Sequence, residues 1–291
     1  MIFQNGGLNV IEYTKISTDD ELIDLRKHWF HENIHAIAMD FEGEFNLHVY
    51  GCKLCLIQVF DGFNFYIIDP FGLSKMELKK TLENKDIIKI FYGSGADISL
   101  VYKQFGIKMN AVLDLKTFVD ALEYEEKGLD TVINKVMGIN INNKKKFQKH
   151  NWIKRPIDEE AIQYALTDVL YLFDLKEKLL NMVIVNGKTE ALIQRIIKYR
   201  FDYDKEVISA FFKSKEYKAL KPEEKKLSEK IYEIREKYAK EINWPAHNLL
   251  EKQDLINVSK NINTIENIKP KKRIREELWS RFKSEILQLN K

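Results

Sequence analysis

The sequence is poor in the features that mark secreted and membrane-embedded proteins. It has only two cysteines, too few for a disulfide framework, so we expect a reducing, cytoplasmic environment. No uncharged apolar run reaches the roughly 18 residues that a membrane helix needs. The first residues also lack the basic-then-apolar pattern of a secretory signal. We therefore predict a cytoplasmic protein with no membrane partner.

The chain also lacks a large excess of one charge. Its formal net charge is +3, so the whole chain is not a basic polyanion binder. The charges are unevenly distributed, however. Residues 221–291 contain 17 Lys and Arg against 12 Asp and Glu, whereas the first 220 residues contain 30 against 32. This division suits a carboxylate-based active site joined to a polyanion-binding module, although ordinary surface variation can give the same numbers.

The apolar pattern of the first 187 residues predicts an α/β fold. Thr18 and Glu21 have the spacing of a capping box, which starts a helix that runs to about residue 31. Short apolar runs separated by turn residues indicate a strand meander at 34–41, 54–60 and 65–68. Further elements are predicted as a helix at 74–83, a strand at 87–92, and helices at 97–105, 115–123, 129–137 and 158–185. Strands first and strand–helix alternation afterwards indicate a mixed sheet flanked by helices.

The remaining residues predict helices alone. Gly187 follows the last long helix, where a C-terminal stop is expected. After Pro222, apolar residues at helical spacing form one stripe: Leu227, Ile231, Ile234, Tyr238 and Ile242. Pro245 ends this helix, and others are predicted at 251–259 and 273–288. We predict an α/β domain at 1–187, a helical connector at 188–220 and a small all-α domain at 221–291.

Acidic side chains occur at the ends of strands or on core-facing sides of helices. The first apolar strand ends in AMDFEGE, and alternate residues share a face, so Asp40 and Glu42 point the same way. Asp97 lies in the first turn of the helix after a buried strand. Asp168 lies on a core-facing helix side, where an unpaired Asp is costly, and Tyr164 lies one turn earlier. Each feature alone also has an ordinary interpretation as a solvated strand end, a helix-dipole interaction or a helix-surface hydrogen bond.

Taken together, these residues have the composition of a two-metal site. Mg²⁺ and Mn²⁺ prefer carboxylate and water ligands. Two such ions can stabilise both the attacking and the leaving oxygen in phosphodiester displacement. A nearby phenol, Tyr164, could orient the attacking water or take its proton. The predicted ligands of two Mg²⁺ or Mn²⁺ ions are Asp40, Glu42, Asp97 and Asp168. No small-molecule organic cofactor is expected.

The motifs resemble those of the DEDD exonuclease superfamily. Asp40 and Glu42 match its first motif, Asp97 its second, and Tyr164 with Asp168 its third. A tyrosine four residues before the last Asp is typical of the tyrosine subgroup. The resemblance implies an RNase H-like fold and hydrolysis from a 3′ hydroxyl end, with release of nucleoside 5′-monophosphates.

Longer segments over residues 10–185 resemble the ribonuclease D family: CLIQVFDG with YIIDP, VLDLK, LDTVINKVMGI, and HNWIKRPIDEEAIQYALTDVLYL. Tyr92 and Asn151 depart from that family, which often has His and Asp there, but neither position is a metal ligand. The segment EIREKYAKEINWPAHNLLEKQDLINVSK resembles the helicase-and-RNase-D C-terminal (HRDC) domain, an auxiliary nucleic-acid-binding module. The resemblance implies RNA with a free 3′ end as the partner, including tRNA precursors.

Two basic segments have both a functional and an ordinary interpretation. Between residues 142 and 157 cations and aromatics interleave without an acid, and the candidate RNA-binding residues are Lys146, Lys149, Trp152 and Arg155. Cations suit phosphates and aromatics can stack on bases. The alternative is a solvated loop with Trp152 in the core. The second basic run, 269–275, equally fits a nucleic-acid surface or a solvated helix end.

Three functions are compatible with the sequence. The leading one is a 3′→5′ exoribonuclease that acts in tRNA 3′-end maturation. A DNA exonuclease of the same superfamily is the second, because no residue pattern reads a 2′-hydroxyl. The third is an inactive RNA-binding adaptor, which has no physical need for a cluster of like charges. The sequence does not predict the oligomeric state or the preferred metal.

Overall fold

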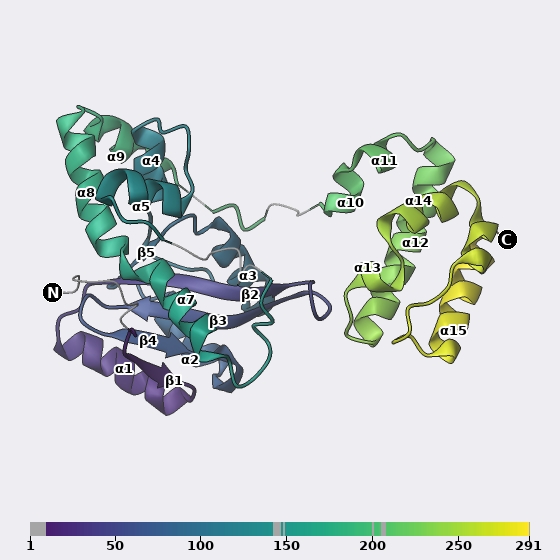
Figure 1. Ribbon diagram of the computed structural model, residues 1–291, viewed down its shortest axis with the longest axis horizontal. Coiled ribbons are helices and arrows are strands. Elements are labelled where there is room, and N and C mark those ends of the chain that lie inside the picture. Colours follow the sequence, from purple (N-terminus) through teal and green to yellow (C-terminus); the bar gives the residue numbers. More distant parts are fainter. Residues whose placement is uncertain (1–9, 142–146, 148, 200, 205–207, 291) are drawn as a thin grey trace. The chain divides into compact units, whose positions relative to one another are not determined.

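The structure is a computed structural model that describes residues 10–141, 147, 149–199, 201–204 and 208–290 (Figure 1). The chain divides into two compact units. Residues 1–43 and 53–203 form the first, which we call the sheet unit. Residues 44–52 and 204–291 form the second, which we call the C-terminal unit.

The sheet unit is built on a six-stranded mixed sheet with the order β1-β4-β3-β2-β5-β6. Its strands are β1 (Tyr13–Ile16), β2 (Ala36–Phe45), β3 (Cys52–Phe60), β4 (Phe65–Ile68), β5 (Ile88–Phe91) and β6 (Val112–Asp114). β3 and β4 are antiparallel, whereas β1 with β4, β2 with β5, and β5 with β6 are parallel. The predicted mixed sheet is confirmed. β6 was not predicted, because three residues are too few to show a strand pattern.

Helices cover both faces of this sheet (Figure 1). On one face α1 (Asp19–His31), α2 (Lys75–Leu82) and α3 (Gly95–Phe105) share a core with Ile37, Met39 and Phe41 of β2. The helices on the other face are α4 (Lys116–Ala121), α5 (Leu129–Met137), α7 (Glu159–Leu170), α8 (Leu172–Val185) and α9 (Thr189–Lys198). They bury apolar residues with Ala38 of β2 and Leu56 of β3. The alternation of β2 is therefore as predicted.

Local chemistry explains where two of these helices begin and end. The side chain of Thr18 accepts from the N–H of Glu21, whose carboxylate accepts from the N–H of Thr18, so the capping box is confirmed. The single helix predicted at 158–185 is wrong, because Tyr171 separates α7 from α8. Residues of α7 pack mainly over β3 and β4, and those of α8 pack against α4, α5 and β5. The break lets one continuous apolar sequence cover two different surfaces.

The C-terminal unit is helical in its described residues after 208, as predicted. Its helices are α10 (Ala210–Lys213), α11 (Lys215–Lys218), α12 (Pro222–Glu241), α13 (Ala246–Leu249), α14 (Lys252–Lys260) and α15 (Glu276–Leu287). Short 3-10 turns are η1 (Pro70–Gly72) in the sheet unit, and η2 (Ile262–Asn267) and η3 (Gln288–Asn290) here. The predicted α12 stripe packs into one core with α14 and α15. No helix in the described part of the chain is long and apolar enough to cross a bilayer.

Candidate active site

Three carboxylates converge at one place on the sheet. Asp40, Glu42 and Asp168 each offer an oxygen, and these oxygens lie within 4.8 Å of one another. Asp40 and Glu42 project from β2, whereas Asp168 projects from α7. All three are half-buried, so ions and water can reach them. Such close anionic groups repel one another unless cations lie between them, and their hard oxygen atoms fit a divalent ion.

Small side chains allow this convergence. Ala161 and Ala165 are fully buried on the side of α7 that faces the sheet, in a cluster with Leu56 and Ile67. Ala38 is fully buried on the corresponding face of β2. Because close packing leaves little space between interior atoms, alanines let a helix approach a sheet closely. The alanines thereby bring the C-terminal half of α7 to the acidic end of β2.

Asp97 lies at the same edge of the sheet but outside that three-carboxylate group. β5 runs parallel to β2 with Ile90 opposite Ala38, so the turn after β5 and the acidic end of β2 share one edge. Asp97 is in the first turn of α3, which follows that turn. Burial, and secondly the Asp114 carboxylate, raise the pKa of Asp97 to about 7. Of the four predicted acids, the structure brings three together and places the fourth beside a further acid.

Asp114 fixes the turn that precedes Asp97. Its carboxylate accepts hydrogen bonds from the N–H groups of Gly93 (2.8 Å), Ser94 (2.9 Å) and Lys116 (2.9 Å), and from the Ser94 hydroxyl (3.0 Å). The Ser94 hydroxyl also lies 2.7 Å from the hydroxyl of Tyr199, which follows α9. Gly93 has a φ of +83°, which glycine adopts at little cost. Tyr199 could not be predicted from the sequence, because no spacing relates it to a turn 105 residues earlier.

Tyr164 lies one helical turn before Asp168, with its ring centroid 5.0 Å from that of Phe147. Burial, and then the carboxylates of Asp168, Glu42 and Asp40, raise the pKa of its phenol above the ordinary value. The phenol is therefore protonated at neutral pH in this arrangement. It can donate a hydrogen bond to a water that lies near the carboxylates.

A buried amide occupies the same face of the sheet. Ile57 and Val59 belong to the core beneath α1–α3, so Gln58 projects to the opposite face, as Asp40 does. Gln58 is fully buried, and neither its amide oxygen nor its nitrogen has a hydrogen-bond partner among the described residues. It lies opposite Ile67 in the β3–β4 pair. Its role could not be predicted from the sequence, because one Gln in an apolar strand has no distinctive spacing.

In the basic segment before α7, two of the predicted RNA-binding residues make contacts inside the protein. Trp152 is 4% exposed and packs with Ala161 and Ala165. The guanidinium of Arg155 pairs with Asp69 (2.7 Å) and donates to the carbonyl oxygen of Cys55 (2.7 Å). These contacts support the alternative interpretation of Trp152 as a core residue. Lys149 is exposed, and Lys146 lies outside the described residues.

Relatives of known type match most of the sheet unit. A family model described as 3′-5′ exonuclease matches residues 13–184. Ribonuclease D of Sphingobium indicum is 29% identical over 50% of this chain and 38% of its own length. Ribonuclease D of Bartonella henselae is 28% identical over 71% of this chain and 52% of its own length. The chain thus spans about half or less of the length of these relatives.

The fold is shared with a solved structure. The crystal structure of Escherichia coli RNase D superimposes with a TM-score of 0.69 at 21% identity, over 95% of this chain and 76% of that one. At that identity the likeness shows the fold, and it confirms the predicted RNase H-like sheet followed by helices. The match of the family model to more than half of the chain adds the family to the fold. This chain belongs to the 3′-5′ exonuclease family, as its resemblance to the DEDD exonucleases predicted.

Proposed function

We propose that this protein is a divalent-metal-dependent 3′→5′ exoribonuclease that releases nucleoside 5′-monophosphates from RNA with a free 3′ end. The observation that carries the proposal is the convergence of Asp40, Glu42 and Asp168 in a chain of the 3′-5′ exonuclease family. RNA is favoured over DNA because the curated relatives are ribonucleases. The same observation opposes an inactive adaptor, since a scaffold gains nothing from three carboxylates held together.

The carboxylates fit Mg²⁺ or Mn²⁺. Asp40, Glu42 and Asp168 would hold one ion between them, and Asp97, at the same edge of the sheet, would complete the ligands for a second. Such ions, when bound, lower the pKa of water and neutralise charge on the attacking and leaving oxygens. The assignment of the four acids as ligands explains why the fold maintains anionic groups at this spacing.

The remaining residues of the site hold the carboxylates in place and orient the attacking water. β2 and α7 fix the three carboxylates relative to one another through close packing at the alanines. Asp114 and Ser94 hold the turn that leads to Asp97. We assign to Tyr164 the orientation of the attacking water, because its protonated phenol lies close to the carboxylates.

The proposal extends to the natural substrate. The Escherichia coli protein is described as an exoribonuclease involved in structured RNA processing. We propose that cytoplasmic tRNA precursors are trimmed at their 3′ ends here. Of the four loop residues predicted to contact RNA, Arg155 is engaged with Asp69 and Trp152 is buried. We retain exposed Lys149 for a phosphate contact, and also Lys146, which lies outside the described residues.

Digestion of one single-stranded RNA with a free or a blocked 3′ end, and of DNA of the same sequence, tests the proposal. We expect a 5′-labelled RNA with a free 3′ hydroxyl to shorten stepwise in Mg²⁺ or Mn²⁺, with nucleoside 5′-monophosphates as products. The same RNA with a 3′ phosphate should resist, and excess chelator should stop the reaction until the ion is restored. DNA of the same sequence should be degraded more slowly. Undiminished hydrolysis in chelator, or equal cleavage of blocked RNA, would refute the proposal.

A further inference from the structure

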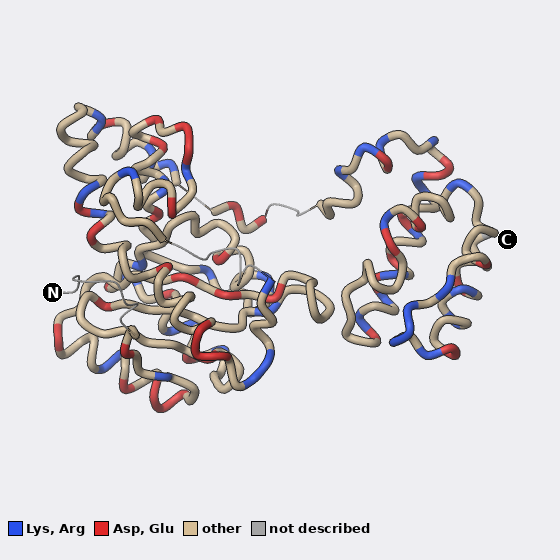
Figure 2. Tube along the Cα trace, in the orientation of Figure 1, with Lys and Arg blue, Asp and Glu red and all other residues tan. Residues whose placement is uncertain are grey.

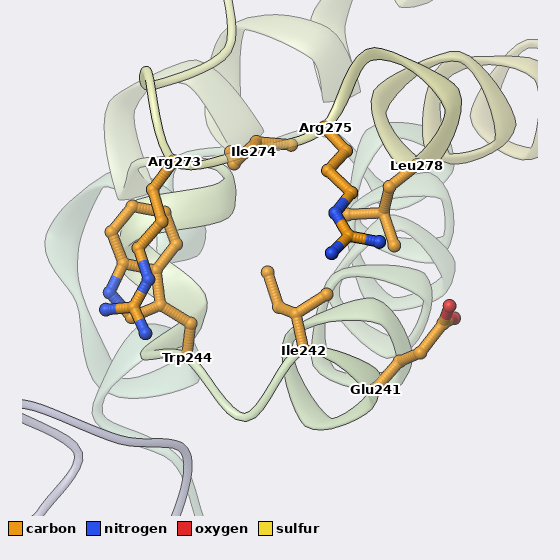
Figure 3. A pocket seen from close by; sticks show the side chains of 7 residues that line it. All are labelled: Glu241, Ile242, Trp244, Arg273, Ile274, Arg275 and Leu278. Atoms are coloured by element: carbon orange, nitrogen blue, oxygen red, sulfur yellow. The ribbon is translucent and has the colours of Figure 1, made fainter.

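The C-terminal unit contains a pocket of about 340 Å³ (Figure 3). It lies between the C-terminal end of α12 and the segment that leads into α15. Its lining residues are Glu241, Ile242, Trp244, Arg273, Ile274, Arg275 and Leu278. The volume is at the lower end of the range for small-molecule sites, which is suitable for a single nucleotide.

The walls of the pocket are apolar and firmly held. Ile274 and Leu278 are 7% and 8% exposed and belong to the core of the C-terminal unit. Trp244 and Ile242 are half-buried and pack against the same core. The guanidinium of Arg273 lies over the Trp244 ring, 5.4 Å from its centroid. A flat aromatic ring, a stacked guanidinium and aliphatic walls are surfaces that accept a nucleobase.

The charge at the pocket is positive. Arg273 and Arg275 are exposed, and neither guanidinium forms an ion pair with a described residue. Glu241, the acid among the lining residues, pairs with Arg281. Glu276 and Glu277 line an adjacent hollow together with Arg275. Figure 2 shows the basic run 269–275 as a largely blue segment before α15, and Figure 3 shows both arginines at the rim.

We propose that this pocket binds one nucleotide of a single-stranded RNA. The base would lie against the apolar walls beside Trp244, and Arg273 and Arg275 would bind the flanking phosphates. Arginine suits this task because its planar guanidinium both stacks on rings and binds phosphate oxygens in pairs. The inference deepens the proposed function and rests on it, since it assumes that RNA is the substrate. It turns the basic excess of residues 221–291 into a defined site.

The test measures binding of the full-length protein to a labelled single-stranded RNA of 12 to 15 nucleotides, in chelator to prevent cleavage. The double variant Arg273→Gln/Arg275→Gln should raise the Kd roughly tenfold or more. It should also reduce the slope of log K against log salt by about 1.4, as expected for two lost phosphate contacts on a single strand. Trp244→Leu should raise the Kd roughly tenfold, and Trp244→Phe, which keeps a ring, should raise it less.

Matched controls separate the pocket from general charge. Lys260→Gln removes an exposed cation at the end of α14 and should leave the Kd within about twofold. Hydrolysis should be unchanged in Lys260→Gln, whereas the pocket variants should need more RNA for half-maximal hydrolysis, so a higher KM in them supports the pocket. A wild-type protein that binds this RNA but hydrolyses none would instead count against the proposed function.

Three results would overturn the pocket assignment. One is an unchanged Kd and salt slope in the double arginine variant. Another is an equal loss in Lys260→Gln, which would mean that charge acts without a site. The third concerns the ligand: free AMP that competes as strongly as RNA, through Trp244 and Arg275, would show a mononucleotide site rather than a strand-binding one.

Discussion

In the sheet unit, the acids of the candidate active site and Lys89 are half-buried or buried. In the C-terminal unit, the arginines of the pocket are exposed. Asp40 and Glu42 of β2 converge with Asp168 of α7 in a half-buried cluster, and Lys89 is completely buried. Arg273 and Arg275 are exposed around an apolar pocket. Burying a charge costs free energy, so a change at a buried charge should affect stability or catalysis. An exposed charge should mainly affect the binding of a charged ligand.

The two basic segments illustrate the same difference. The first combines cations with Trp152, whereas the second, 269–275, has no aromatic residue of its own. In the sheet unit, however, Trp152 is buried and Arg155 pairs with Asp69, so the segment fastens α7 to β3 and β4. In the C-terminal unit, Trp244 lines a pocket and Arg275 has no ion pair with a described residue. Basic segments thus support stability in one unit and, as we propose, ligand binding in the other.

Apart from the metal ligands, the largest effect that sharpens this comparison is expected at Tyr164. Tyr164→Phe removes the phenol oxygen but keeps the ring that packs near Phe147. We expect single-turnover hydrolysis to fall roughly 10²-fold or more, because a water-orienting group contributes mainly in the transition state. RNA affinity and the metal concentration for half-maximal rate should stay the same. Near-full turnover would show that the phenol is a structural group. The control Tyr171→Phe, at the C-terminal end of α7, should keep full turnover.

The next effect concerns the stability provided by Arg155. Arg155→Met leaves the buried Asp69 carboxylate without its guanidinium, so the free energy of unfolding should fall by about 3 kcal/mol in a denaturant titration. Lys154→Met, an exposed neighbour, should change it by less than about 0.5 kcal/mol. If Arg155→Met lowered the free energy of unfolding by less than about 0.5 kcal/mol, Arg155 would contribute no more to stability than an exposed residue.

The same pair predicts an acid dependence. Burial opposes ionisation of Asp69, but the Arg155 guanidinium and the N–H of Phe71 outweigh it and hold the pKa below its usual range. The stability from this group is therefore present above about pH 4 and is lost as the pH falls through the lowered pKa. The Arg155→Met variant should lose this acid-side dependence relative to wild type. Parallel acid titrations of the two proteins would contradict the account.

A smaller effect is expected from Lys89. Its ammonium is fully buried and donates to the carbonyl oxygens of Asn84 and Asn110, and burial lowers its pKa to about 8. Between that pKa and the unfolded value of about 10.4, the unfolded chain binds more protons, so stability rises with pH. Relative to Lys89→Met, wild-type stability should increase by about 2 kcal/mol from pH 8 to pH 10.5. A constant difference between the two proteins would exclude this burial cost.

The local parts of the fold could be predicted from the sequence, and the long-range parts could not. The capping box at Thr18 and the alternation that aligns Asp40 with Glu42 depend on spacings of two to three residues. Asp168 could be found because an acid on a core-facing helix side requires a reason. The break at Tyr171 and the contact of Tyr199 with Ser94 depend on surfaces that exist only once the chain has folded.

The C-terminal pocket shows the same limit. The basic run at 269–275 was visible in the sequence, but a charge run alone fits a solvated surface equally well. What separates the two interpretations is the position of Trp244, contributed by a different segment, against Arg273. Ion pairs show which cations of the run can bind a ligand. Lys271 is paired with Glu251, whereas Arg275 is not paired with a described residue.

The central claim is that the inward carboxylates perform the chemistry, and one measurement tests it most directly. Single-turnover hydrolysis of 3′-hydroxyl RNA is compared over a Mg²⁺ titration for wild type, Asp168→Asn and Asp174→Asn, an exposed acid of α8. We predict that Asp168→Asn lowers the maximal rate roughly 10³-fold or more and raises the Mg²⁺ concentration needed for half-maximal rate. Asp174→Asn should behave like wild type. Equal rates and equal Mg²⁺ dependence in wild type and Asp168→Asn would contradict the claim.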